Sequence, residues 1–240
     1  MPESDGPSGE SRSSLAKQES SVRHLQQLYT IVAGLALSDA VGQLFTENGS
    51  WRARATLLLL FAFVVTLVPF YHGALRHLDD VYLIDASTHQ VRRAGLAVDF
   101  VFLFAESCLL VAMAHRLADP TGFLSLFLSL LLTDIVWSVA QHFAAPRTRR
   151  VAAELQLLFR SPRSSFVYPM VWAKNNLLFV VFTIAGWTAA GMWLALGDTT
   201  HAALLALLTL ARTANDYRSS WDFYFPPPQQ GELPQTTVIL

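Results

Sequence analysis

The chain has 240 residues, of which 52% are hydrophobic and only 15% are charged, with a formal net charge of −1. Soluble domains average about 25% charged residues, and several apolar stretches here approach the roughly 20 residues that cross a bilayer as a helix. The composition therefore excludes an ordinary soluble domain, and we expect the lipid bilayer rather than nucleic acid as the partner. A single cysteine, Cys108, excludes a disulfide framework within the chain.

The predicted organisation has three parts. Residues 1–22 are rich in Ser, Glu, Gly and Pro, which predicts a disordered cytosolic tail. Residues 23–225 predict an all-α integral membrane bundle of about six transmembrane helices, at about 25–45, 54–75, 94–117, 121–145, 170–197 and 200–218. The last helix carries Arg212 and Asp216, so an interfacial or re-entrant segment, and hence four or five spans, remains an alternative. Residues 226–240 predict a proline-rich, extended tail.

The distribution of basic residues predicts the orientation. With six crossings, only Arg52, Arg54 and Arg116 of the 17 lysines and arginines fall on one side of the membrane. Cytosolic loops carry the excess of Lys and Arg. We therefore expect both termini to be cytosolic, in a multi-pass protein of the cell membrane.

The connecting segment at about 146–168 is basic, and its apolar residues recur at helical spacing. This pattern predicts a short helix lying on the cytosolic leaflet. Its basic residues would contact anionic lipids there; they are Arg147, Arg149, Arg150, Arg160 and Arg163. The alternative is that these arginines serve only to fix the topology.

Small residues four apart occur in two predicted helices, as Gly34, Ser38 and Gly42 in the first and as Gly186 and Ala190 in the fifth. Such spacing lets another helix approach closely. Whether that helix belongs to the same chain or to a second copy in a homo-oligomer stays open.

Five carboxylic acids fall within the predicted helices, and four of them lie in the first, third and fourth helices. A charge at the centre of a spanning helix costs about 2.5–3.5 kcal/mol, so such residues face the bundle interior. Helical spacing places them on polar stripes, and we interpret those four as candidate ion or proton sites: Asp39, Asp99, Glu106 and Asp134.

A second polar group lies nearer the cytosolic side of the predicted helices. It predicts an inward-facing polar vestibule formed by His72, His142, Asn175, Arg212 and Asp216. The buried acids outnumber the reliably charged buried base, so we expect some of them to hold a proton. The alternative is a set of separate polar pairs that only lock helix packing.

The stretch PFYHGALRHLDDVYL at residues 69–83 ends the second predicted helix. Pro69 removes one backbone donor and predicts a kink. We expect His72 to face the inner polar layer, whereas the other titratable residues mark the membrane boundary at a solvated helix end: Arg76, His77, Asp79 and Asp80.

Catalytic and metal-binding motifs are absent from the sequence: there is no HExxH, no Gly-x-Ser-x-Gly, no phosphate loop and no cysteine-rich ligand set. We therefore predict no catalytic residues, metal or cofactor, and lean away from an enzyme. The leading hypothesis is a multi-pass scaffold, sensor or effector that acts through its basic cytosolic face or by helix association. The alternative is a small channel or a proton/ion-coupled transporter that uses Asp39, Glu106 and Asp134. A membrane-embedded lipid-modifying enzyme ranks third.

Overall fold

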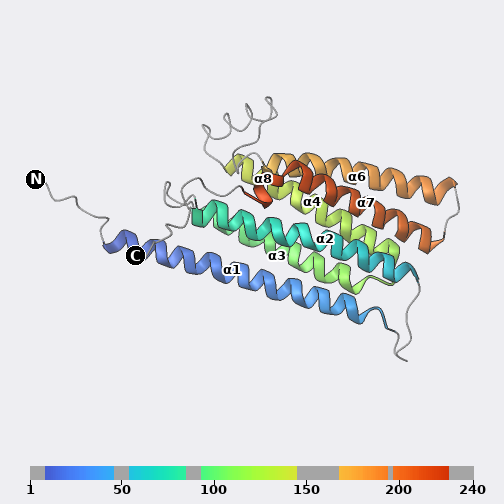
Figure 1. Cartoon of the computed structure of the whole chain (residues 1–240), viewed down its shortest axis with the longest axis horizontal. Coiled ribbons are helices and arrows are strands. Elements are labelled where there is room, and N and C mark those ends of the chain that lie inside the picture. The colour runs from blue at the N-terminus through green and yellow to red at the C-terminus, as the bar shows by residue number, and fades with distance from the viewer. Residues whose placement is uncertain (1–8, 46–53, 85–92, 145–167, 194–196, 227–240) are drawn as a thin grey trace, which may run out of the picture.

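The computed structural model describes residues 9–45, 54–84, 93–144, 168–193 and 197–226 (Figure 1). The long helices of these residues are α1 (Gly9–Gly42), α2 (Arg54–Leu78), α3 (Arg93–His115), α4 (Pro120–Ala144), α6 (Tyr168–Trp193) and α7 (Asp198–Ser219). Two short elements extend them. The π-helix η1 (Asp79–Ile84) continues α2, and α8 (Trp221–Tyr224) follows α7.

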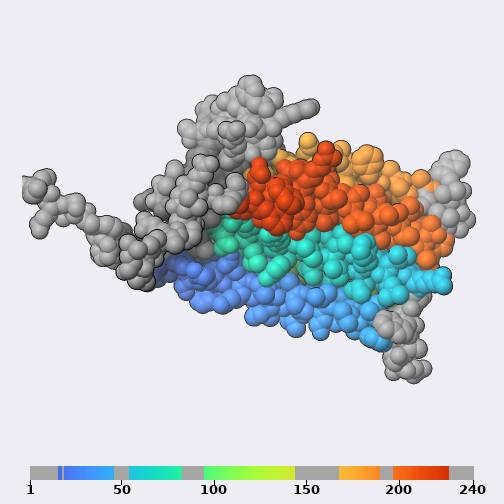
Figure 2. Space-filling model, in the orientation of Figure 1, coloured from blue at the N-terminus to red at the C-terminus, as the bar shows by residue number. Residues whose placement is uncertain are grey.

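Successive long helices run in opposite directions and form one elongated bundle (Figure 1). Helix α2 packs between α1 and α7, and the three lie side by side on the face seen in Figure 2. Helix α4 contacts both α3 and α6. The end of the bundle that holds the connection between α3 and α4 is called the α3–α4 end, and the opposite end is called the α8 end.

The structure supports the coarse prediction of a helical membrane protein. Four of the described helices have the length and hydropathy needed to cross a membrane: Arg54–Tyr82, Gly95–His115, Pro120–Phe143 and Tyr168–Ala189. Helices α1 and α7 do not meet that criterion by composition. Helix α7 carries Arg212 and Asp216, and α1 begins with a polar stretch.

Helix α1 begins much earlier than its apolar residues indicate. The sequence predicts disorder through residue 22, whereas the structure is helical from Gly9 onward. An ion pair between Arg23 and Glu19 at 2.7 Å joins positions one helical turn apart. Because extending an existing helix is far easier than nucleating one, a polar segment can continue a helix whose apolar part is already packed.

A close-packed apolar core fills the bundle toward the α3–α4 end. It contains the fully buried Leu59 and Phe63 of α2 together with Phe123 and Phe127 of α4. Lipid tails are as apolar as these side chains, so the core stabilises helix association through close packing rather than through removal of water.

The outward surfaces of the helices are also apolar. Large exposed side chains include Leu35 of α1, Phe104 of α3, Phe182 of α6 and Leu207 of α7. In water such a surface would drive association, whereas in a bilayer it faces lipid.

Pro69 has no N–H to donate to the carbonyl of Val65 four residues earlier in α2. That carbonyl instead accepts a hydrogen bond from the Thr213 hydroxyl of α7 at 2.9 Å. The proline therefore creates an acceptor that ties α2 to α7.

The stripe of small residues on α1 does not contact another helix of the described chain. Gly34, Ser38 and Gly42 are exposed, and a Cβ at Gly34 or Gly42 would meet no atom within 4 Å. Gly186 of α6 faces α7, where Leu208 lies 4.0 Å from the position of an added Cβ.

Candidate functional site

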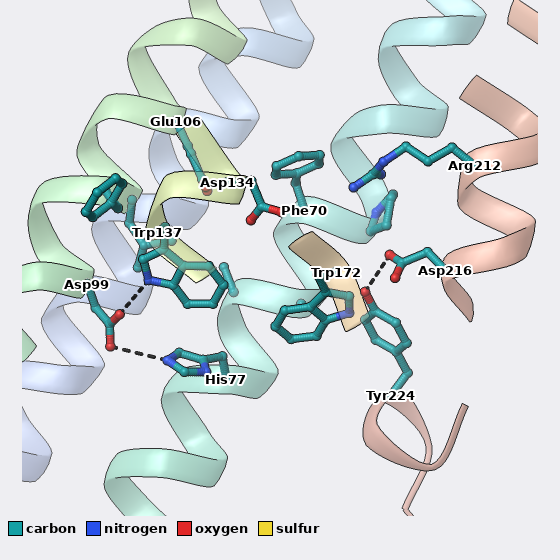
Figure 3. A pocket seen from close by; sticks show the side chains of 15 residues that line it. Phe70, His77, Asp99, Glu106, Asp134, Trp137, Trp172, Arg212, Asp216 and Tyr224 are labelled. Carbon is teal, nitrogen blue, oxygen red and sulfur yellow. Dashed lines mark hydrogen bonds and ion pairs between the residues drawn. The ribbon is translucent and has the colours of Figure 1, made fainter. Parts of the chain in front are cut away.

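A cavity with a mostly apolar wall and several polar side chains lies between the middle of the bundle and α8 (Figure 3). About 40 Å³ of it is open to the centres of water-sized molecules, and one water needs roughly 10–15 Å³ by this measure. Its wall contains His77, Asp99, Glu106, Asp134, Arg212 and Asp216. Polar side chains of four long helices thus meet around a space that fits a few waters or a small ligand.

Asp99 of α3 is fully buried and has a hydrogen-bond donor on every side. Its Oδ2 accepts a hydrogen bond from the Tyr82 hydroxyl at 2.6 Å and lies 3.3 Å from Nε2 of His77. Its Oδ1 accepts from Nε1 of Trp137 at 2.7 Å and from the side-chain amide of Gln141. Donors from α2, η1 and α4 surround this carboxylate, so it ties three helices together.

The π-helix explains how two side chains five residues apart reach the same oxygen. In a regular α-helix, positions 77 and 82 would point about 140° apart. A π-helix closes its hydrogen bonds five residues apart, and η1 therefore brings Tyr82 round toward the side of His77. Gly95 leaves room for the ring, because a Cβ there would lie 3.2 Å from the Tyr82 hydroxyl.

Asn176 of α6 links the acid of α4 to the arginine of α7. Its Nδ2 donates to Oδ2 of Asp134, and its Oδ1 accepts from Nε of Arg212 at 2.8 Å. The guanidinium carbon of Arg212 also lies 4.8 Å from the centre of the Phe70 ring. This chain of contacts joins α4, α6 and α7, and it places the arginine charge against an aromatic face of α2.

Two buried atoms on the cavity wall, Nη1 of Arg212 and Oδ1 of Asp216, have no hydrogen-bond partner among the described residues. A buried polar group without a partner costs about 1–3 kcal/mol, so these two atoms need water or a ligand. The Glu106 carboxylate, 4% exposed, lies on the same wall and receives no hydrogen bond from any described residue. Figure 3 shows Glu106 and Asp134 on one side of the cavity and Arg212 and Asp216 on the other.

Aromatic side chains close the cavity on the side of α8. The buried cluster joins Trp137, Tyr168, Trp172, Phe223 and Tyr224. The Tyr224 hydroxyl donates to Oδ2 of Asp216 at 2.9 Å. Burial, together with the facing Asp216 carboxylate, raises the pKa of Tyr224, so its phenol keeps the proton that it donates.

A contact from α2 holds α8 in place. Nε of Arg76 donates to the backbone carbonyl of Phe223 at 3.0 Å. On the same side of α2, a Cβ at Gly73 would lie 3.3 Å from the Tyr224 hydroxyl. The short helix therefore forms part of the wall, and its displacement would open the cavity.

The structure brings together most of the predicted ion sites but not all of them. Asp99, Glu106 and Asp134 line the cavity, as do Arg212 and Asp216 of the predicted vestibule. Asp39 lies one turn before the end of α1, at the opposite end of the bundle. Its carboxylate is 37% exposed, with Oδ2 3.7 Å from Nδ1 of His115.

The other residues of the predicted vestibule lie near the cavity without lining it. Nδ1 of His72 lies 3.3 Å from the Tyr217 hydroxyl. Asn175 donates to the Ser219 hydroxyl at 3.1 Å, and the His142 ring packs against Phe143. The first two contacts join α2 and α6 to α7, and none of the three residues lines the cavity.

Sequence reasoning missed His77 and the aromatic wall. His77 is only 6% exposed and contacts Asp99, so its expected place at a solvated helix end was wrong. Trp137 falls four residues before Gln141 and three after Asp134, so helical spacing could have placed it beside the acid. Nothing in the sequence indicates that α8 folds back to deliver Tyr224.

The five arginines predicted to contact anionic lipid lie outside the described residues. Within the described ranges, no group of three His, Cys, Asp or Glu side chains is arranged to hold a metal ion. Comparisons with protein-family models, with curated proteins and with solved structures find no match to this chain. The case for a function therefore depends on the cavity itself.

Proposed function

We propose that this chain is a multi-pass membrane sensor in which a small polar or charged ligand occupies the cavity and α8 relays its presence to the cytosol. The observation that carries the proposal is a pair of buried atoms without a hydrogen-bond partner among the described residues, Nη1 of Arg212 and Oδ1 of Asp216, on the wall that also holds the buried Glu106. Groups of this kind are costly unless something binds them.

The proposal includes six membrane crossings, with α1 and α7 beside the four apolar helices. The exposed faces of these two helices support it, because they present large apolar side chains such as Ile31 and Leu35 of α1 and Leu207 of α7. The charged side chains Arg212 and Asp216 lie on the opposite face of α7, where they are buried within the bundle. A helix that is polar inside and apolar outside fits a position facing lipid.

The side of the cavity that α8 covers would face the cytosol. The α8 end holds Lys17, Arg23 and Arg76, and Arg218 ends α7 there, whereas Arg54 and Arg116 mark the α3–α4 end. This asymmetry agrees with the positive-inside rule, and it supports cytosolic termini.

The apolar core favours a sensor over a channel. An ion crossing the membrane would have to pass between buried side chains such as Phe63, Phe127 and Leu130, which fill the bundle beyond the cavity. Ions cross hydrocarbon-like layers only at high cost. A cavity closed toward the outside and lined by α8 on the other side can report occupancy without carrying a flux.

The test follows the position of α8 and the ion flux in parallel. Because Cys108 is the only cysteine, a spin label is placed at the exposed position 222 in a Cys108→Ser, Asp222→Cys background. We expect Glu106→Gln to change the mobility of the label, because it alters the charge inside the cavity, whereas the exposed Glu19→Gln leaves it unchanged. Proteoliposomes should show no proton, sodium or potassium flux above empty vesicles.

A Glu106-dependent flux would overturn the sensor proposal in favour of the ion-coupled transporter. Unchanged label mobility in Glu106→Gln would show that the cavity and α8 are not coupled. The third hypothesis, a membrane-embedded lipid-modifying enzyme, would use His72, Asp79 and His142. His72 contacts Tyr217 and Asp79 accepts from Gln26, so these contacts do not join the two residues into one site.

A further inference from the structure

We propose that the ligand of the cavity is a small amino alcohol, that is, an organic ammonium ion of a few heavy atoms with a neutral hydroxyl oxygen. This inference rests on the proposed function of the same site and names its ligand class. It is carried by the charges of the wall, its aromatic surface, the one unpaired donor and the size of the space.

The charges of the wall call for a cation. Asp99 already has its four donors, including the imidazole of His77. The remaining carboxylates are those of Glu106, Asp134 and Asp216, and the remaining base is Arg212. Acidic groups therefore exceed basic groups in a space of low dielectric constant, where an excess acid either keeps its proton or faces a cation. A bound ammonium would take the place of such a proton, with Glu106, which accepts no hydrogen bond from the described residues, as its partner.

The aromatic surface favours an organic cation over a metal ion. Phe70, Phe102, Trp137, Trp172 and Tyr224 contribute to the wall, and aromatic faces attract organic cations by about 0.5–2 kcal/mol each. The cavity already holds one such group, since the guanidinium of Arg212 lies over Phe70. Among the described residues, no three acidic, histidine or cysteine side chains are grouped as metal ligands.

The unpaired Nη1 of Arg212 adds a second requirement. This buried N–H group donates to nothing among the described residues, so a ligand oxygen that accepts from it would remove a cost of about 1–3 kcal/mol. A carboxylate on the ligand would add to the excess of acids, so a neutral oxygen is the fitting acceptor, and a hydroxyl is a small group that supplies one. Figure 3 shows Glu106 and Arg212 on different sides of the wall, and the ligand would turn its ammonium toward the glutamate and its hydroxyl toward the arginine.

The volume limits the ligand to a few heavy atoms. The 40 Å³ open to the centres of water-sized molecules corresponds to about three waters at roughly 10–15 Å³ each. Ethanolammonium, with four heavy atoms, matches this size, and propylammonium has the same number of heavy atoms without the oxygen.

The experiment measures binding to the purified full chain in lipid nanodiscs, through tryptophan fluorescence and thermal unfolding. The probes are ethanolammonium chloride, propylammonium chloride, 1-propanol and, for ionic strength, sodium chloride. We expect saturable binding of ethanolammonium, weaker binding of propylammonium, and no saturable response to 1-propanol or sodium. Glu106→Gln should weaken ethanolammonium binding by about tenfold or more, whereas the matched exposed Glu19→Gln leaves it unchanged.

Phe102→Leu provides a second variant if Glu106→Gln does not fold. Phe102 lines the cavity and takes part in no described hydrogen bond, and its loss should weaken both ammonium probes. Absence of saturable ethanolammonium binding to the wild-type chain would overturn the ligand class, as would equal responses to ethanolammonium and sodium. The spin-label test of the sensor uses no ligand, so the two proposals can fail separately.

Discussion

Replacement of Asp99 by asparagine is the sharpest test of the polar core. The wild-type carboxylate is fully buried and accepts four hydrogen bonds, two on each oxygen. Asparagine keeps one accepting oxygen but presents an NH₂ group in place of the other, so two buried donors would face another donor. At about 1–3 kcal/mol for each unsatisfied donor, Asp99→Asn should lower the free energy of unfolding by about 2–6 kcal/mol. That loss is a large part of the about 5–15 kcal/mol that stabilises a typical protein.

The assay is equilibrium unfolding by SDS in mixed micelles, followed by circular dichroism. The control is Asp222→Asn, which makes the same chemical change at an exposed position of α8 and should alter the free energy of unfolding by less than about 0.5 kcal/mol. A loss below about 1 kcal/mol for Asp99→Asn, or a loss equal to that of the control, would refute the reasoning that this carboxylate holds three helices together.

Two further predictions concern contacts between helices. Thr213→Val removes the hydrogen bond to the Val65 carbonyl and should cost about 1 kcal/mol of unfolding free energy. The cost should vanish in a Pro69→Ala background, because the alanine N–H can bond that carbonyl; equal costs in both backgrounds would contradict this. Asn176→Ala should lower the free energy of unfolding by about 1–3 kcal/mol more than Asn175→Ala. Asn176 bridges two helices through two hydrogen bonds, whereas Asn175 makes one. Equal losses for the two variants in the same unfolding titration would contradict this.

Desolvation and helical spacing were sufficient to identify the interior acids of α3, α4 and α7. Glu106, Asp134 and Asp216 are buried on the wall of one cavity, as expected for charged residues that turn away from lipid. The same argument placed Asp39 with them, but Asp39 lies near the end of α1 and is partly exposed. The predicted depth of Asp39 in the membrane depended on where α1 ends, and the spacing of apolar residues defines a helix end poorly.

The choice between His72 and His77 could not be made from spacing. Both histidines lie on α2, and the structure puts the later one against Asp99, where the π-helix that follows α2 also delivers Tyr82. Analysis based on 3.6 residues per turn does not anticipate that change of period. The fold-back of α8 is a contact between segments distant in sequence, held by Arg76 and Asp216, and no local pattern encodes it.

Chemical access to Glu106 tests the central claim most directly. In a Cys108→Ser, Glu106→Cys chain in oriented vesicles, a small thiol reagent that carries an ammonium group is applied from one side at a time. The account predicts modification from the cytosolic side only, because displacement of the short helix α8 opens the cavity on that side, whereas the apolar core fills the bundle on the other. Modification from both sides, from the outer side only, or from neither side would contradict it.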